Sequence, residues 1–184
     1  SDTRKGSGRY YLTNQRFVGD NLTDDIKKQR AGSGAPIQNI NDYGLEMGGP
    51  IRKGKLWYWG SFAKQHINTG IVGFYLPTEK CQAIKTTLNA DPLAKSATYV
   101  DENGETKTVE TTTSSARRCL GTDGTVLDNY NWKLNWAVSR SNTFSFQNTW
   151  AAKTKNARDA SDTRPIETTY RQMAVSSKYG TYGW

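Results

Sequence analysis

The sequence is poor in the residues that build an ordinary globular core. Leu, Ile, Val and Phe together make up 30 of its 184 residues, a share below that of typical globular domains. Uncharged polar residues dominate instead, with 55 Ser, Thr, Asn and Gln. Such a composition, combined with a net charge of +8, would by itself favour disorder. No apolar run reaches the roughly 18 residues that a transmembrane helix requires, which excludes that class.

Histidine and cysteine are almost absent. One His and two Cys are too few for a Cys/His zinc site, so we expect no metal ion and no cofactor. No set of nucleophile, histidine and acid stands out, so we do not expect an enzyme. We interpret His66 as an ordinary polar strand residue. Residues 101–105 are interpreted as a turn, because they lack the residue order of a calcium loop.

The excess of basic residues raises the question of nucleic-acid binding. The sequence pI is about 9.5, but the basic residues, such as Arg117 and Arg118, are scattered over the loops. They form no stripe on a helix or on a known module, so we expect no nucleic-acid partner. A basic β-domain that binds single strands in a salt-dependent manner is kept as a third hypothesis.

Aromatic residues are abundant, with six Trp, ten Tyr and five Phe, and they favour β-structure. Within residues 128–138 and 143–153, large apolar side chains alternate with polar ones. The residues assigned to one face are Tyr130, Trp132, Leu134, Trp136, Val138, Phe144, Phe146, Trp150 and Ala152. A period of two indicates half-buried strands. Further strands are predicted at residues 8–18, 37–48, 55–68 and 168–177.

The connections between these strands have very unequal lengths. Residues 19–36, 69–127 and 154–167 form the longer ones, whereas residues 49–54 and 139–142 form short turns. Transmembrane β-barrels combine tight periplasmic turns with long external loops in this way. We therefore predict an all-β fold: antiparallel strands of a transmembrane β-barrel with long extracellular loops. Six strands are too few for a barrel of about eight or more, so residues 1–184 are expected to be a fragment of a longer barrel domain.

Local structure is also expected inside the connections. A helix is predicted over residues 78–89, between Pro77 and Pro92. Asn103 and Gly104 predict a hairpin with a type I′ turn. Thr23 is expected to cap one short helical turn.

The segment 42–62, DYGLEMGGPIRKGKLWYWGSF, combines a GGPI phrase, basic residues and an aromatic run. It resembles the early barrel hairpin of TonB-dependent outer-membrane receptors, in the Oar-like branch that carries a carboxypeptidase-regulatory-like domain. The residues of this hairpin motif are Gly48, Gly49, Pro50, Ile51, Lys55 and Gly60. Residues 6–17 resemble the preceding strand of that family, and residues 129–150 resemble a following hairpin.

The resemblance implies a receptor in the bacterial outer membrane that imports a scarce nutrient through a plug-gated barrel. The nutrient would be a siderophore, an oligosaccharide or a peptide, and no ligand-binding residue is assigned. The implied partners are outer-membrane lipid, the rest of the barrel and its plug, and TonB, through a part of the parent chain absent here. Residues 69–127 are expected to form an extracellular loop insertion that contacts the ligand. The alternative is a secreted β-sandwich or adhesin-like binding module, whose aromatic faces would form a two-sheet core.

Two further sets of residues follow from the barrel hypothesis. Aromatic residues near strand ends are expected at the membrane interface, where one end of the ring is apolar and the other is wet. They are Trp57, Tyr58, Trp59, Tyr130, Trp132, Trp136, Phe144, Phe146 and Trp150. Cys81 and Cys119 lie in the same expected external loop, where a disulfide is permitted. We expect a bridge between them, with two unpaired cysteines as the alternative.

Overall fold

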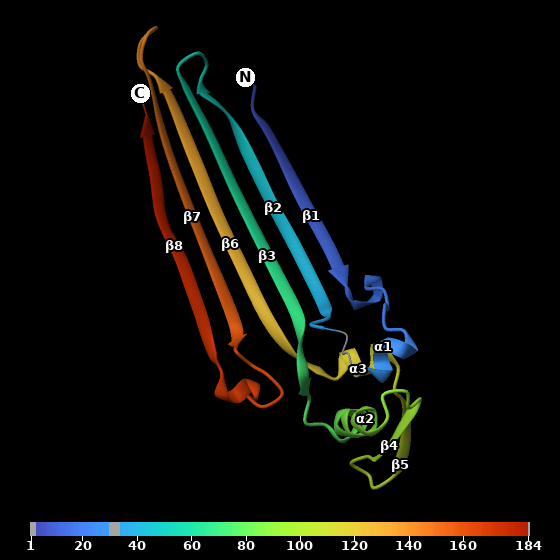
Figure 1. Cartoon of the computed structure of the whole chain (residues 1–184). Coiled ribbons are helices and arrows are strands. Elements are labelled where there is room, and N and C mark those ends of the chain that lie inside the picture. The colour runs from blue at the N-terminus through green and yellow to red at the C-terminus, as the bar shows by residue number, and fades with distance from the viewer. Residues whose placement is uncertain (1–2, 30–33, 184) are drawn as a thin grey trace.

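The computed structural model describes residues 3–29 and 34–183, and its main element is one antiparallel sheet of six strands (Figure 1). The strands are β1 (Lys5–Asn14), β2 (Ile37–Arg52), β3 (Leu56–Tyr75), β6 (Leu120–Ala137), β7 (Thr143–Arg158) and β8 (Tyr170–Gly183). They lie side by side in the order β1-β2-β3-β6-β7-β8. The predicted all-β, antiparallel fold is confirmed. The sheet is open, because β1 and β8 each pair with a single neighbour.

A small module is inserted between β3 and β6 and lies beyond one end of the sheet (Figure 1). We call residues 76–119 the loop module. It contains α2 (Glu79–Ala90), β4 (Ser96–Val100), β5 (Thr106–Glu110) and α3 (Thr113–Arg118). Three further short helices lie in the other long connections: η1 (Gln15–Phe17), α1 (Asp24–Lys28) and η2 (Ile166–Thr168). No helix among residues 3–29 and 34–183 is long and apolar enough to cross a membrane.

The long and short connections lie at opposite ends of the sheet. The β1–β2 connection, the loop module and the β7–β8 connection gather at one end, which we call the loop end (Figure 1). The β2–β3 and β6–β7 turns lie at the other end, the turn end, together with both chain termini. The predicted alternation of long and short connections therefore corresponds to two different ends of the sheet.

The strands are longer than the alternation of apolar residues predicted, mainly towards the loop end. β3 continues past residue 68, and β6 starts at Leu120 rather than at residue 128. In this extension Thr69 pairs with Asp123, and Gly70 with Thr122. Backbone groups can pair whether or not the side chains alternate. The predicted 69–127 loop is therefore too long, and the insertion spans residues 76–119.

The turn between β2 and β3 is also shorter than predicted. Gly48, Gly49 and Pro50 lie inside β2, and the turn is closed by the Lys55 amide, which donates to the Arg52 carbonyl at 3.0 Å. Gly54 has a φ of 70°, a conformation that favours glycine. Pro50 is tolerated in the strand because the register is interrupted between Pro50 and Arg52 and because β1 pairs only as far as Gly48.

The two faces of the sheet differ sharply in chemistry. The register places five rings on one face, which we call the aromatic face: Tyr10, Tyr43, Phe62, Tyr130 and Trp150. The opposite, polar face carries hydrogen bonds between neighbouring strands. Arg9 donates to Asp42 at 3.0 Å, and Asn131 donates to Ser61 at 3.1 Å.

The cluster of buried apolar residues lies in the loop module, and the buried apolar residues of the sheet, Ile71, Leu120, Ala152 and Ala157, are outside it. The cluster consists of Cys81, Ile84, Ala97 and Cys119, and Ile84 is completely buried. The sheet strands contact mainly one another, and on the aromatic face Tyr130 and Trp132 remain 46% and 51% exposed. In the part of the chain that the structure describes, no second layer of strands or helices covers the sheet (Figure 1).

Candidate functional site

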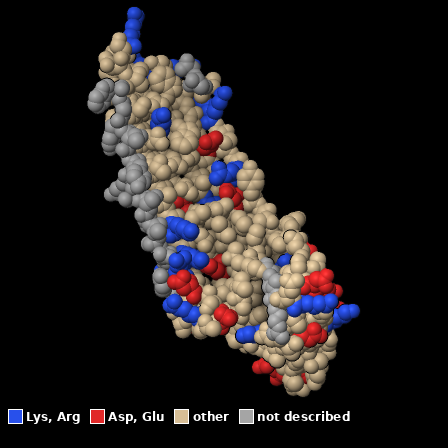
Figure 2. Space-filling model, in the orientation of Figure 1, with Lys and Arg blue, Asp and Glu red and all other residues tan. Residues whose placement is uncertain are grey.

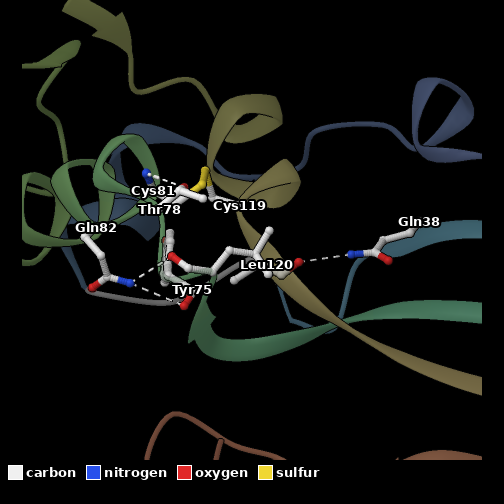
Figure 3. Close-up of a disulfide and its surroundings, with 8 residues drawn as sticks. Gln38, Tyr75, Thr78, Cys81, Gln82, Cys119 and Leu120 are labelled. Atoms are coloured by element: carbon white, nitrogen blue, oxygen red, sulfur yellow. Dashed lines mark hydrogen bonds between the residues drawn. A yellow bond between two sulfur atoms is a disulfide. The ribbon is translucent and has the colours of Figure 1, made fainter. Parts of the chain in front are cut away.

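The loop module is built around a helix and a disulfide. Thr78 caps α2 by accepting a hydrogen bond from the Cys81 amide at 3.4 Å, so the helix begins close to where the sequence predicted. Cys81 is bonded to Cys119, which ends α3 (Figure 3). The expected disulfide is confirmed. It closes a loop of 38 residues in sequence separation, and closing such a loop stabilises a fold by about 2–4 kcal/mol.

Hydrogen bonds attach the module to the end of the sheet (Figure 3). The Leu76 amide donates to the Cys119 carbonyl at 2.8 Å, so the two ends of the module meet. The side-chain amide nitrogen of Gln82 donates to the Leu76 carbonyl at 2.9 Å and to the Tyr75 carbonyl at 3.3 Å. On the sheet side, Gln38 of β2 donates to the Leu120 carbonyl at 3.3 Å. The helix is therefore fixed to the strand from which the module departs.

The β4–β5 hairpin confirms the predicted strands but not the predicted turn. A type I′ turn needs a positive φ at both central residues. Only Gly104 has one, with a φ of 78°. The Gly104 amide donates to the Asp101 carbonyl at 3.0 Å, and the Asp101 amide donates to the Glu105 carbonyl at 2.9 Å. This pattern is that of a three-residue hairpin loop that ends in a left-handed glycine.

The Asp101 carboxylate organises the same turn. It accepts hydrogen bonds from the amides of Asn103 and Glu105, both at 3.0 Å. The bond from the Glu105 amide, together with that from Asn103 and a bond from Lys107, holds the pKa of Asp101 below its ordinary value. The carboxylate is thus occupied by its own turn. Among the described residues, no group of three or more His, Cys, Asp or Glu is placed to hold a metal ion.

A groove of about 740 Å³ lies between the loop module and the β1–β2 connection. Three segments far apart in sequence line it: residues 22–27, 88–95 and 110–116. Tyr75, the last residue of β3, completes the lining. Volumes of roughly 300–1,000 Å³ are typical of small-molecule sites, so this groove is the candidate ligand-binding site.

The wall of the groove formed by residues 22–27 is held by capping interactions. Thr23 accepts a hydrogen bond from the Ile26 amide at 3.4 Å, which confirms it as the cap of α1. The Leu22 amide donates to Asp20 at 3.1 Å. A hydrogen bond with the Thr113 side chain is the main cause that holds the pKa of Asp20 below its ordinary value. Asp20 therefore connects this wall to the start of α3.

The chemistry of the groove is mixed. Its apolar residues are Leu22, Leu88, Pro92, Leu93, Ala94 and Ala116, all of them partly exposed. Its charged residues are Asp24, Lys27, Lys95 and Glu110, so each long side of the groove carries one acid and one base. Asp24 and Lys27 lie 3.7 Å apart. The groove thus offers apolar surface with no net charge among its formally charged lining residues.

The predicted interface aromatics divide between the two faces of the sheet. Seven of the nine share the aromatic face: Tyr58, Tyr130, Trp132, Trp136, Phe144, Phe146 and Trp150. Trp57 and Trp59 are adjacent to Tyr58 in sequence, and the pleat therefore turns them to the polar face. There they pair with Asn135 and Lys133. The aromatic run 57–59 therefore has one ring on the aromatic face and two on the polar face, and its expected place at a membrane interface stays a prediction.

An aromatic belt crosses five strands at mid-height of the sheet. The ring centroids of Tyr10 and Tyr43 are 6.4 Å apart, and those of Tyr43 and Phe62 are 6.1 Å apart. The belt continues from Phe62 to Tyr130 at 5.2 Å and from Tyr130 to Trp150 at 5.1 Å. His66 lies just beyond the belt, stacked on Tyr43 at 6.3 Å. Beyond the belt, towards the loop end, the same face becomes polar.

The polar continuation of the aromatic face is visible in its paired side chains. Lys64 and Asp128 form an ion pair at 3.2 Å, and Asn68 donates to Asn39 at 2.7 Å. Figure 2 shows one face of the molecule, on which Lys, Arg, Asp and Glu side chains lie along the sheet as well as over the loop end. The aromatic face therefore has an apolar half near the turn end and a polar half near the loop end.

The hairpin-motif residues Gly48, Gly49, Pro50 and Ile51 lie at the turn end of β2, and Gly60 lies opposite Met47 in β3. Lys55 follows them in the turn, and none of these residues lines the groove at the loop end. No family model matches this chain, and it has no significant match among the curated proteins or the solved structures.

Proposed function

We propose that this chain forms part of the barrel wall of a TonB-dependent outer-membrane receptor that captures and imports a scarce nutrient. The observation that carries the proposal is a sheet with one apolar half-face that no other element covers within residues 3–29 and 34–183 (Figure 1). On the aromatic face of β7 the apolar stretch runs from Phe144 to Ala152, and it contains one polar residue, Asn148, opposite Trp132. Its nine positions match the roughly 9–11 residues that a tilted strand needs to cross a bilayer.

The position of the apolar stretch shifts steadily between β3 and β1. On β3 it extends towards the loop end as far as Phe62, on β2 as far as Tyr43, and on β1 as far as Leu12. Phe62 pairs with Leu45, and Tyr43 lies two residues closer to the loop end than Leu45. Tyr43 pairs with Tyr10, and Leu12 lies two residues closer to the loop end than Tyr10. Strands that tilt through a planar apolar layer produce such a displacement, and barrel strands are tilted by about 35–45°.

The open edges of the sheet fit a section of a larger barrel. β1 and β8 each have one neighbour, and unpaired backbone groups in lipid cost several kcal/mol each. In the proposed receptor, further strands of the same barrel pair with both edges. The polar face then lines the lumen that holds the plug, and the aromatic face contacts lipid. The loop module lies outside the cell, where its groove can meet the nutrient.

A secreted β-sandwich or adhesin-like module is the second candidate. The exposed aromatic face favours it, since such a face also suits packing against another sheet about 10 Å away. The two candidates differ in what covers the aromatic face. Lipid covers it in the receptor, and protein covers it in the sandwich.

Two neighbouring positions on opposite faces test this difference in the complete protein. Trp132→Cys and Lys133→Cys are each labelled with bimane, and the labelled proteins are reconstituted in vesicles of dioleoyl phosphatidylcholine or its brominated analogue. We expect brominated lipid to quench bimane at position 132 and to leave position 133 bright. If neither position is quenched and the protein stays in solution without detergent, the receptor proposal is wrong and the sandwich is favoured.

A further inference from the structure

We infer that the groove between the loop module and α1 binds a short peptide as a zwitterion, with its apolar side chains against the leucines of the groove. This inference names a substrate class for the proposed receptor and rests on that function. Binding of the peptide in this groove does not itself require that the sheet lie in a membrane.

The charged residues that line the groove do not favour a ligand with a large net charge. Lys27 and Asp24 stand on one side, and Lys95 and Glu110 on the other, so the four formal charges cancel. A polyanion such as a phosphorylated compound would meet as many acids as bases. A ligand that carries one ammonium and one carboxylate finds an opposite charge on either side of the groove.

The shape and lining of the groove favour a peptide over a sugar. Sugar rings are commonly held by stacking against flat aromatic side chains, and Tyr75 is the one aromatic residue among those that line the groove. Aliphatic contact is more plentiful, since Leu22 comes from residues 22–27, Leu88 and Leu93 come from residues 88–95, and all three are half-buried. Branched aliphatic side chains of a peptide can replace water on these surfaces.

The groove is prepared by contacts that do not depend on a ligand. Thr111, at the end of β5, donates from its amide to the Lys95 carbonyl at 3.0 Å, and its side chain donates to the Ala94 carbonyl. The Leu93 amide donates to Asp91 at 2.9 Å. These bonds fix the segment that carries Leu93 and Lys95. A preformed site loses less conformational entropy on binding than a flexible one.

Binding of Leu-Leu-Leu to the complete protein, measured by isothermal titration calorimetry, tests the inference. Acetyl-Leu-Leu-Leu-amide has the same side chains without charged ends, and maltotriose represents the sugars. We expect the uncapped peptide to bind and the capped peptide to bind about two- to fivefold more weakly, as fits partly exposed ion pairs. Maltotriose should give no heat of binding.

Two matched variants place the binding in the groove. Leu93→Asn should abolish detectable binding of Leu-Leu-Leu. Val100→Asn should leave it unchanged, because Val100 is 53% exposed and lies outside the groove lining. Circular dichroism of both variants checks that the protein remains folded.

Several results would overturn the inference: binding of maltotriose in place of the peptide, equal affinity for capped and uncapped peptide, no binding of any probe, or equal binding by wild type and a folded Leu93→Asn variant. These results are separable from failure of the receptor proposal. Lipid quenching at position 132 reports whether the aromatic face contacts lipid. Calorimetry reports whether the groove binds the peptide, and neither result depends on the other.

Discussion

The sheet and the loop module of this chain are stabilised in different ways. The loop module encloses Ile84 completely and is cross-linked by a disulfide. The much larger sheet has its backbone groups paired between strands, yet Trp132 and Leu45 on its aromatic face are 51% and 57% exposed. Apolar surface of this extent is unfavourable in water at about 25 cal/mol per Å². The module therefore supplies its own core, whereas the stability of the sheet depends on what covers the aromatic face.

The largest expected effect comes from the core of the module. Ile84→Ala removes a fully buried side chain, and we expect it to cost about 2–5 kcal/mol of the module's unfolding free energy. Ile51→Ala is the matched control, because Ile51 is 55% exposed, and its effect should be within about 0.5 kcal/mol. Hydrogen exchange of the amides in α2 and β4 measures the loss. Equal loss of protection in β6 and β7 would show that module and sheet are not separate units.

A charge on the aromatic face should destabilise the sheet if lipid covers that face. Trp132 pairs with Asn148, the middle residue of the Phe144–Ala152 stretch, which in the proposed barrel lies near the bilayer midplane and not at the interface. Arginine on the lipid side of barrels costs about 2–4 kcal/mol at that depth, and we expect a similar cost for Trp132→Arg. Thr149→Arg introduces the same charge on the opposite face, beside Asn131, and should cost much less. Urea unfolding of the complete protein in phosphatidylcholine vesicles measures both. Equal costs would mean that the two faces meet similar surroundings.

A smaller effect is expected at the hairpin turn of the module. Gly104 has a φ of 78° with open space around it, so Gly104→Ala meets backbone strain without a steric clash. We expect a loss of about 1 kcal/mol in hairpin stability, seen as faster exchange of the Asp101 amide. Glu102→Ala, at an exposed position of the same turn, should leave that rate nearly unchanged. If the two variants behave alike, the left-handed glycine is not required.

The smallest effect concerns pH and the same turn. The pKa of Asp101 is lowered from its ordinary 3.8 by hydrogen bonds to its carboxylate. A carboxylate whose folded pKa is depressed contributes stability above its unfolded pKa, and that contribution is lost as the pH falls through the folded pKa. The hydrogen-exchange rate of the Asp101 amide, corrected for the intrinsic rate, should therefore stay constant above about pH 5. It should increase as the pH falls below 3.8. Asp101→Asn should remove this pH dependence.

Alternating side chains made the sheet predictable from sequence. Tyr130, Trp132, Leu134 and Trp136 share a face, as their spacing predicted. The extensions of β3 and β6 near the loop end were missed. Residues 69–75 and 120–127 lack an alternation of apolar and polar side chains, and backbone pairing alone cannot be recognised in a sequence. The split of Trp57 and Trp59 from Tyr58 follows from strand geometry alone, so a strict application of the two-residue period to residues 57–59 would have found it.

The candidate binding groove could not be predicted in the same way. Leu22, Leu88 and Thr113 meet there only because the module docks against the β1–β2 connection. The cap at Thr23 and the helix between Pro77 and Pro92 were predicted from local signals, and the disulfide was predicted once both cysteines were placed in one loop. Contacts between segments that are distant in sequence leave no local pattern, so the lining of the groove required the structure.

The meeting of Leu76 and Cys119 has a consequence for how such chains can diversify. The backbone leaves and re-enters the sheet at two residues that are directly hydrogen-bonded to each other. The two ends of residues 76–119 are therefore adjacent where they join β3 and β6. We therefore expect that a polypeptide whose own ends lie close together can replace that segment and leave the register of β3 against β6 unchanged. The site therefore suits recombination in nature, and it suits the display of foreign binding domains by protein engineers.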